Sequence, residues 1–308
     1  MTTPDRKPEK TAGEPAAETA RRSAGTVAET AGSSSGTTAE TAGTAAETAA
    51  MEAGPGGVTA LHVEVDGAPA ADPELLATLM SGYGHFTAMQ VRDGRVQGLG
   101  LHLDRLDRST RELFGRALDV GLVRTRLAGA LAAAGRRDAS ARVYVYEGAH
   151  AVVTVRAPFP DDRQPWSLKS VAYWRPAAHI KHLGGFGQAF HGDAARRAGF
   201  DEALLTGGPD AEIAEGAVTN IAFWDGSSVV WPSAPHLAGI TMQLLAPRLP
   251  SVTRRVTLAD VPSFRAAFVT NSRGISPVSR IDDVTLGVDE ELMARVYAAQ
   301  EEVPWEVL

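Results

Sequence analysis

Hydrophobic and polar positions change their spacing along the chain, and these changes predict where its strands and helices lie. The segment FTAMQVRDGRVQGL alternates on both sides of an Asp-Gly pair, which predicts a β-hairpin. In LHLDRLDRSTRELFG apolar residues recur at helical spacing and the segment ends in glycine, which predicts a helix with a glycine stop. By the same criteria we predict helices at about 119–135, 188–198 and 289–301, and strands within 61–65, 141–158, 168–174, 202–207, 212–232 and 264–272.

The start of the chain differs in composition from the rest. Threonine, alanine, glycine, serine and glutamate dominate there, the motif AETA recurs, and no aromatic residue occurs. Such a segment buries too little apolar surface to offset its ordering entropy, so we expect residues 1–56 to be a disordered low-complexity head. Met51, near the end of this head, is a candidate for the true start of the protein.

The proline-rich stretch PFPDDRQPW predicts an interdomain linker at residues 157–164. Strand and helix patterns occur on both sides of it, which indicates an α/β (α+β) fold. We therefore expect a small α/β domain at 57–156 and a larger domain at 165–308, both of ordinary domain size.

The bulk composition excludes several functional classes. The chain has 308 residues, of which 44% are hydrophobic and 22% charged, as is usual for a soluble globular protein. Its net charge of -7 argues against nucleic-acid binding, and no apolar run approaches the ~20 residues of a membrane span. The absence of cysteine removes disulfides, thiolate catalysis and cysteine-bound zinc. We expect a cytoplasmic protein that binds no nucleic acid, membrane or metal.

One lysine stands out against the chain's strong preference for arginine. Of the 30 basic residues only four are lysines, and two of those lie in the low-complexity head. Lys181 lies between two histidines in the small and apolar stretch AAHIKHLGGFGQAF. A lone lysine is usually a surface cation. Unlike arginine, however, a desolvated lysine loses its proton and attacks carbonyl carbon.

Three further features favour a chemical role for this lysine. LAGIT is a glycine-containing turn that opens a helix, where free backbone amides bind phosphate, and VTNS ends a strand with small polar side chains. Glu215 lies in the apolar stretch AEGAVTN, where a carboxylate needs a positively charged partner. Pyridoxal phosphate requires all three: an amine, a phosphate cradle and a carboxylate against its pyridine nitrogen.

Five motifs, in this order, resemble those of the fold-type-IV pyridoxal-phosphate enzymes. They are HLDRL, IKHL, GFDEALLTGGPDAEIAEGAVTNIAFW, LAGIT and TNSRGISPVSRID. The family includes branched-chain and D-amino-acid aminotransferases and aminodeoxychorismate lyase. The resemblance implies a two-domain fold like that of D-amino-acid aminotransferase, with the cofactor in the cleft between the domains. It also implies a homodimer whose partner subunit places residues near the pocket.

The resemblance assigns a role to each matching residue. Lys181 is the catalytic residue that holds the cofactor's aldehyde and moves the substrate's Cα proton, and Glu215 is the partner of the pyridine nitrogen. The cofactor's phosphate is assigned to Arg105, to the backbone amides of Ile240 and Thr241, and to the segment that contains Asn271 and Ser272.

The parts of the family pattern that select substrate and reaction are mixed in this chain. Phe86-Thr87 and IKHL resemble the lyase, whereas LAGIT and SPVSRID resemble the transaminases. Phe186 stands where some branched-chain enzymes carry a tyrosine that touches the cofactor, and Met242 replaces an arginine. We take Phe86 and Phe186 as candidate substrate-pocket residues. His179 and His182 are expected to be pocket or surface residues rather than metal ligands.

The first hypothesis for the function is a pyridoxal-phosphate-dependent class IV aminotransferase that moves an amino group from an amino acid to a 2-oxo acid. The second is a lyase that releases pyruvate from 4-amino-4-deoxychorismate. The third is a non-catalytic paralogue that acts as a binding protein, which the intact pair of Lys181 and Glu215 disfavours.

Overall fold

The computed structural model of the chain describes residues 64–65, 68–69, 71–147, 150–161 and 163–308. The head predicted at 1–56 lies outside them, as does most of the strand predicted at 61–65. All the described residues belong to one compact unit, residues 54–308. A short ribbon of β1 (Glu64–Val65) and β2 (Ala68–Pro69) opens this unit and is followed by α1 (Pro73–Met80). None of the described helices is long and apolar enough to cross a membrane.

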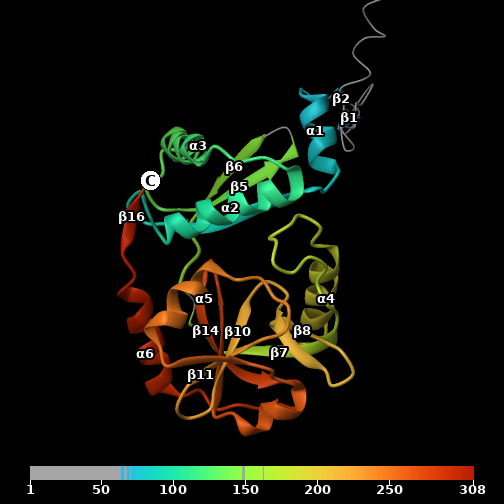
Figure 1. The fold of residues 1–308 in the computed structure, drawn as a ribbon, viewed down its shortest axis with the longest axis vertical. Coiled ribbons are helices and arrows are strands. Elements are labelled where there is room, and N and C mark those ends of the chain that lie inside the picture. The colour runs from blue at the N-terminus through green and yellow to red at the C-terminus, as the bar shows by residue number, and fades with distance from the viewer. Residues whose placement is uncertain (1–63, 66–67, 70, 148–149, 162) are drawn as a thin grey trace, which may run out of the picture. The chain divides into compact units, whose positions relative to one another are not determined.

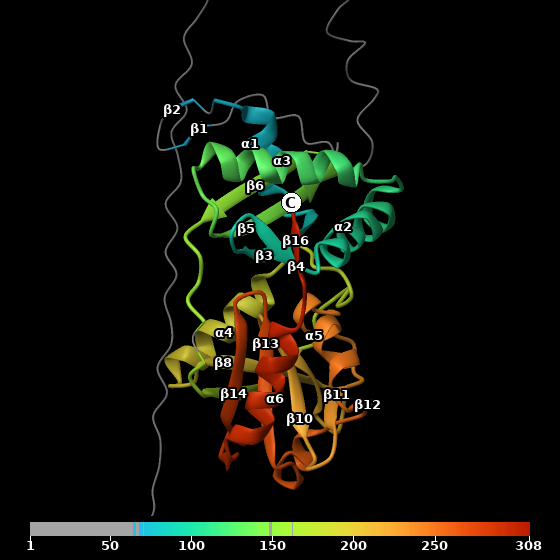
Figure 2. The same cartoon turned by 90° about the vertical axis from the view of Figure 1, so that its left-hand side faces the viewer.

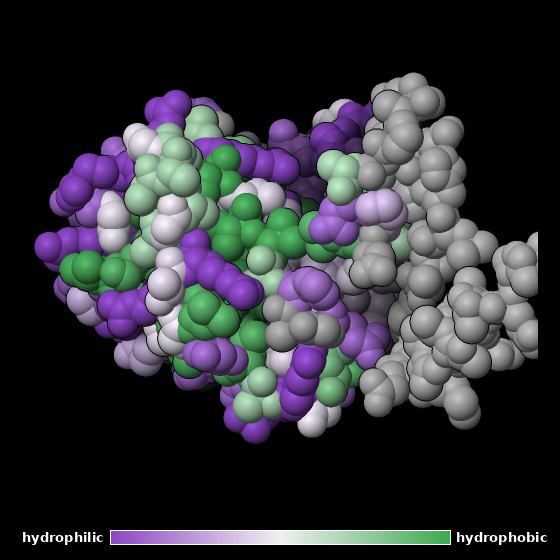
Figure 3. All heavy atoms as spheres, turned by 90° about the horizontal axis from the view of Figure 1, so that it is seen from above, coloured by the Kyte–Doolittle hydropathy of each residue, from purple (hydrophilic) through white to green (hydrophobic). Residues whose placement is uncertain are grey.

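The N-terminal sheet has three antiparallel strands in the order β3-β5-β6 (Figure 1). Two helices pack on it through a core that includes Leu106, Leu127 and Val143. Large hydrophobic residues also remain exposed in this part, among them Met80 and Leu122, and the face seen in Figure 3 interleaves hydrophobic with hydrophilic residues. The elements are β3 (Gly84–Val91), α2 (Leu99–Phe114), α3 (Val120–Ala133), β5 (Ala139–Tyr146) and β6 (Ala151–Arg156).

The C-terminal sheet has nine strands in the order β12-β11-β10-β13-β14-β7-β8-β9, with β15 on the edge of β14 (Figure 2). Parallel pairing joins β7 to β8 and to β14, and also β11 to β12; the other pairs are antiparallel. The strands are β7 (Trp166–Ala172), β8 (Glu202–Gly207), β9 (Glu212–Gly216), β10 (Asn220–Trp224), β11 (Val229–Pro232), β12 (Ser251–Arg254), β13 (Ala266–Asn271), β14 (Gly274–Ile281) and β15 (Val284–Thr285).

Both faces of this sheet are buried, because alternate strand residues enter different cores. In β10, Ile221 and Phe223 belong to the core that includes Phe264, whereas Ala222 and Trp224 belong to the core beneath two helices. These helices are α5 (Ile240–Leu245) and α6 (Glu290–Glu301), and α4 (Phe186–Arg197) packs on β8. Two short 3-10 helices lie at Ala246–Arg248 and Leu258–Ser263.

Most of the predicted elements are confirmed, but the hairpin is only partly right. Asp93 and Gly94 both have the positive φ of a tight hairpin turn, and a single bridge joins Arg92 to Arg95. Beyond that bridge β4 (Arg95–Gln97) pairs with the C-terminal strand β16 (Trp305–Val307), a partner that local sequence does not reveal. Glu306 also accepts a hydrogen bond from the amide of Leu99 at 2.9 Å, so the end of the chain caps α2.

The loop that carries Lys181 joins the edge of the N-terminal sheet. The amide of Phe86 donates to the carbonyl oxygen of Lys181 at 2.9 Å, and the amide of Leu183 donates to Gly84 at 2.9 Å. The loop, residues 173–185, connects β7 to α4, and this pairing fixes the backbone of Lys181 against β3. A Cβ on Gly84 would lie 2.8 Å from the carbonyl oxygen of Val145, so this position requires glycine.

We therefore predict that Gly84→Ala destabilises the protein by about 1–3 kcal/mol, the usual range for overpacking against backbone that cannot move away. Gly129→Ala is the matched control, because open space surrounds Gly129 on α3 and alanine there should stabilise by about 0.5–1 kcal/mol. Thermal or urea unfolding of both variants measures the difference. Equal stability of the two would contradict the close packing of the loop on β3.

Candidate active site

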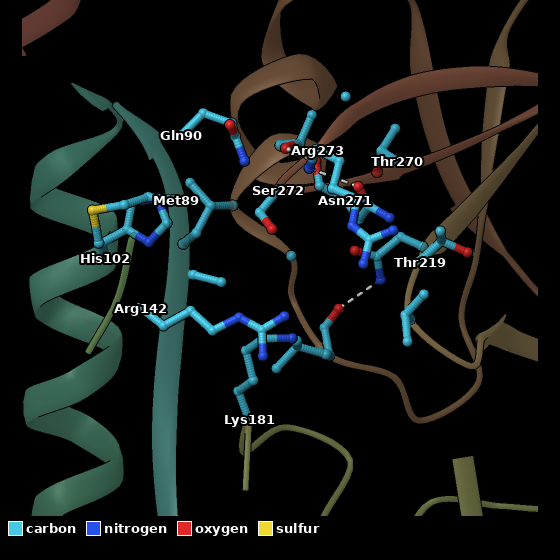
Figure 4. Close-up of a pocket in the computed structure, with 18 of the residues that line it drawn as sticks. Met89, Gln90, His102, Arg142, Lys181, Thr219, Thr270, Asn271, Ser272 and Arg273 are labelled. Carbon is cyan, nitrogen blue, oxygen red and sulfur yellow. Dashed lines mark hydrogen bonds between the residues drawn. The ribbon is translucent and has the colours of Figure 1, made fainter. Parts of the chain in front are cut away.

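A cavity of about 600 Å³ lies between β3, the lysine loop, α5 and the ends of strands β9, β10 and β13 of the C-terminal sheet (Figure 4). Among the sequence-predicted residues, those that line it are Phe86, Arg105, Lys181, Glu215, Ile240, Thr241, Asn271 and Ser272. Residues up to 186 positions apart in the sequence, from Phe86 to Ser272, therefore line one cavity. Phe186 does not line the cavity.

Burial and the charges of neighbouring residues make the side chain of Lys181 lose its proton more readily than an ordinary lysine. Its Nζ lies 4.8 Å from the centroid of the Phe86 ring and forms no hydrogen bond or ion pair within the described part of the chain. Burial, followed by the positive charges of Arg105 and Arg175, lowers the pKa of Lys181 to about 7, although Glu215 acts in the opposite direction. A large fraction of this amine is therefore neutral, and nucleophilic, near pH 7.

Glu215, on β9, has both carboxylate oxygens engaged. Its Oε1 accepts from Arg175 Nε at 2.9 Å and its Oε2 accepts from the amide of Leu237 at 3.1 Å. The Arg175 guanidinium also donates to the carbonyl oxygens of Ile180, at 2.6 Å, and Ala178. Both members of the ion pair are buried. Arg175 thus ties the carboxylate directly to the backbone just before Lys181.

The sequence analysis missed this role of Arg175. A signal was present: a buried arginine needs a carboxylate or carbonyl partner, and AEGAVTN offered a buried carboxylate that lacked one. The pairing itself is non-local, since 40 positions separate Arg175 from Glu215.

Arg105, on α2, projects from a buried polar network. It donates to the hydroxyl of Thr87, which in turn lies 2.6 Å from Nδ1 of His102. Burial and the charge of Arg105 hold the pKa of His102 well below its usual range, so this histidine is neutral. Burial, together with Arg108, lowers the pKa of Arg105 to about 10, so the guanidinium stays charged near pH 7.

Three buried polar atoms of cavity-lining residues have no partner within the described residues: Nε of Arg105, the hydroxyl of Thr270 and Nε2 of Gln90. Buried donors are almost always satisfied in folded proteins, so such orphans indicate a place where another group binds. Because the unpaired Nε belongs to a cation, the group it suits is an anion.

The LAGIT turn lies in contact with Asn220 of β10. Asn220 donates to the carbonyl oxygen of Leu237 at 2.7 Å, and a Cβ on Gly239 would lie only 2.0 Å from the Asn220 side-chain oxygen. Gly239 is therefore required for this close approach. The amides of Ile240 and Thr241, at the start of α5, have no side-chain cap. The hydroxyl of Thr241 donates to the carbonyl oxygen of Asn271 at 2.9 Å, which joins the two predicted phosphate segments.

Arg142 is a cavity residue that the sequence analysis did not single out. Its side chain extends from β5 into the cavity toward the end of Lys181 (Figure 4). It contacts the hydroxyl of Tyr144 at 3.3 Å and lies 5.8 Å from the Phe86 ring centroid, with no carboxylate partner in the described chain. Strand alternation in ARVYVY was the available signal, because it places residues 142 and 144 on one face and the buried Val143 and Val145 on the other.

Phe186 is placed outside the cavity, contrary to its prediction as a substrate-pocket residue. Its side chain is 81% exposed and stacks on Phe190, with ring centroids 5.9 Å apart. Phe186 is the first residue of α4, and residues four positions apart share one face of a helix. Gln188 and Ala189 of the same helix line the cavity instead.

The two histidines beside the lysine have other partners. His179 pairs with Glu112 of α2 at 2.7 Å in an exposed position, and His182 contacts the carbonyl oxygen of Pro176 at 2.9 Å. No group of three or more potential metal ligands among His, Asp and Glu comes together in the described chain.

Comparison with known proteins identifies the family of this site. The family model for amino-transferase class IV matches residues 84–281. The chain belongs to the class IV aminotransferase family. This confirms the family that the five motifs resembled, and with it the mixed α/β fold of the fold-type-IV enzymes. A search of curated protein sequences found no match.

Solved structures share the class IV fold at low sequence identity. One is described as a hypothetical aminotransferase from Mycobacterium tuberculosis in a PLP-bound form; identity is 21%, coverage 78% of this chain and 95% of that one, and the TM-score 0.67. A branched-chain aminotransferase from Thermoproteus uzoniensis with norvaline has 19% identity, coverage of 77% of this chain and 93% of that one, and a TM-score of 0.67. A structure described as a putative 4-amino-4-deoxychorismate lyase from Legionella pneumophila has 17% identity, coverage of 73% of this chain and 93% of that one, and a TM-score of 0.67.

We predict that brief acetylation of Lys181 by acetic anhydride reaches half of its maximum near pH 7, because only the neutral amine reacts. The extent of labelling rises through pH 7 and levels off above it. Peptide mass spectrometry over a pH series measures it, and Lys169, whose ammonium is paired with Asp282 at 2.8 Å, is the reference within the same protein. Labelling of Lys181 that still rises steeply near pH 10, where an ordinary lysine titrates, would contradict the desolvated site.

Proposed function

We propose that this class IV aminotransferase-family protein is a pyridoxal-phosphate-dependent transaminase that moves an amino group from an amino acid to a 2-oxo acid. The observation that carries the proposal is the presence, in one cavity, of an amine with a lowered pKa and a buried carboxylate held by Arg175. The similar M. tuberculosis structure is described as PLP-bound, which supports the same cofactor for this chain.

The residues present fit pyridoxal phosphate at each of its reactive or charged ends. The unpartnered Nε of Arg105 and hydroxyl of Thr270, with the uncapped amides of Ile240 and Thr241, suit a phosphate dianion. The Lys181 amine suits the aldehyde, and Glu215 suits a protonated pyridine nitrogen. Because Gly239 has no Cβ, the LAGIT turn packs closely against Asn220, and this contact fixes the position of its backbone amides.

Bound pyridoxal phosphate supplies an electron sink for the bond that breaks at the substrate's Cα. The protein's own residues then have separate tasks. Lys181 would hold the cofactor through its amine, and its free Nζ would accept the proton of the substrate's Cα as a general base, a role that contributes typically ~10²–10⁴-fold. Glu215 would accept a hydrogen bond from the pyridine nitrogen, and Arg175 orients that carboxylate relative to the lysine loop.

Arg142 supports an acid as substrate. A guanidinium with no carboxylate partner in the described chain, close to Lys181, suits the carboxylate that amino acids and 2-oxo acids share. Phe86, which stacks on Tyr144 with ring centroids 5.4 Å apart, forms an apolar wall beside it. The same groups accept both members of a transamination pair.

A second candidate function is the lyase reaction that releases pyruvate from 4-amino-4-deoxychorismate. The motif IKHL and the pair Phe86-Thr87 favour it, as does the shared fold of the structure described as a putative lyase. Thr87 is, however, already engaged by Arg105 and His102, which leaves its hydroxyl a structural role. The transaminase therefore remains the first choice.

The half-reaction with single amino acids separates these functions. We predict that the holoenzyme, given one amino acid and no acceptor, changes its visible absorbance to that of the pyridoxamine form and releases the matching 2-oxo acid. Pyruvate release from 4-amino-4-deoxychorismate without any such change supports the lyase instead. A chain that stays colourless with added cofactor would contradict both and favour a binding protein.

A further inference from the structure

A second buried carboxylate lies behind the wall of the cavity. Glu202, the first residue of β8, is 2% exposed and does not line the cavity itself. Its Oε1 accepts from the amide of Val218 at 2.5 Å, and its Oε2 accepts from the hydroxyl of Thr219 at 2.7 Å. Both donors belong to the turn that follows Glu215.

This turn, residues 216–219, forms a continuous part of the cavity wall, because each of its four residues lines the cavity. The amide of Gly216 donates to the carbonyl oxygen of Thr219 at 2.9 Å, and Gln188 donates to the carbonyl oxygen of Ala217 at 2.9 Å. The amide of Val218 takes no part in these bonds and donates to Glu202 instead.

The packing between the turn and Glu202 leaves no spare room. A Cβ on Gly216 would lie 2.1 Å from the hydroxyl oxygen of Thr219 and 2.8 Å from Oε2 of Glu202. Glycine is therefore needed for the turn to reach the carboxylate. A displacement of Glu202 would be transmitted to Thr219, whose side chain lies at the cavity (Figure 4).

We propose that Glu202 is a positioning residue of the active site: it fixes the turn 216–219 so that the wall next to Glu215 keeps the shape that the cofactor requires. The cofactor in this proposal rests on the proposed function. The geometry rests on the observed contacts of Glu202.

A role in folding stability alone does not explain why this position carries a carboxylate, because a buried charge lowers stability. Burial, together with Glu215, raises the pKa of Glu202 to about 7, whereas Arg196 of α4 and the two hydrogen bonds act in the opposite direction. The carboxylate thus costs folding stability as pH rises through 7. Glutamine has the same shape and no such cost, but its amide nitrogen is a donor, so the hydroxyl of Thr219 would have to accept instead of donate.

This reversal distinguishes the ionised residue from its neutral form. When Glu202 is ionised, the Thr219 hydroxyl donates to it and offers only lone pairs to the cavity. When Glu202 is protonated or replaced by glutamine, the Thr219 hydroxyl accepts, and its own proton is free to turn toward the cavity. The groups that face Glu202 and set its charge state are Glu215 from β9 and Arg196 from α4.

The experiment measures pyridoxal phosphate dissociation from the full-length chain for wild type, Glu202→Gln, Thr219→Val and Thr219→Ser. We expect Glu202→Gln and Thr219→Val to weaken cofactor binding about tenfold, as the loss of one hydrogen bond to a charged group does. Thr219→Ser keeps the hydroxyl and should bind the cofactor with wild-type affinity. The affinity of wild type should also change more as pH crosses 7 than that of Glu202→Gln, whose remaining pH dependence is that of Lys181.

Thr257→Val is the matched control. Asp260 accepts from the amide of Thr257 at 2.8 Å and from its hydroxyl at 2.9 Å, so this pair also joins a carboxylate to a threonine hydroxyl and an amide, away from the cavity. This variant should lower the melting temperature and leave cofactor affinity unchanged. If Glu202→Gln and Thr219→Val behave as Thr257→Val does, the positioning role is wrong.

Hydrogen exchange separates this proposal from the proposed function. In the cofactor-free chain, Glu202→Ala should speed exchange of the Val218 amide about tenfold or more, because its acceptor is gone. Unchanged exchange would overturn the role of Glu202 whatever the protein catalyses. If instead wild type binds no pyridoxal phosphate but Val218 responds, the proposed function fails and the contact between Glu202 and the turn stands.

Discussion

The proposed active site depends on one buried ion pair, that between Arg175 and Glu215. The guanidinium bonds to the carboxylate and to two carbonyl oxygens of the loop before Lys181, so the acid and the amine are held by the same group. A buried charge left without its partner is strongly destabilising, so neither member of the pair can be lost alone. The lysine loop is held a second time by its backbone pairing with β3. Together these contacts fix Lys181 relative to both sheets.

The charges of the cavity explain why a lysine is used in a chain that otherwise prefers arginine. Burial lowers the pKa of Lys181 most, the charges of Arg105, Arg175 and Arg142 lower it further, and Glu215 opposes them. An arginine at position 181 would stay protonated in this field and could not act as nucleophile or base. The same positive field, with unpartnered donors at its edge, favours an anionic cofactor and acidic substrates. In the proposed function, one electrostatic arrangement thus serves both binding and reactivity.

The sequence predicted the parts of the site that local motifs encode. The bias toward arginine exposed Lys181, and the order of five motifs brought Glu215, Arg105, the LAGIT turn and the Asn271 segment together. Helix α2 and its glycine stop followed from periodicity, since Gly115 adopts the left-handed conformation that ends a helix. The pairs that local sequence could not predict are non-local: Arg175 with Glu215, and β4 with β16. Phe186 was misplaced because helix phase, not distance from Lys181 along the chain, decides which side chains of α4 face the cavity.

The central claim is that one amine, that of Lys181, forms the covalent bond to pyridoxal phosphate. The most direct test is borohydride reduction of the cofactor-loaded protein followed by peptide mass spectrometry. The account predicts a single phosphopyridoxyl group, attached to Lys181, and none after Lys181→Ala. Attachment to Lys169, or to no lysine at all, would contradict it.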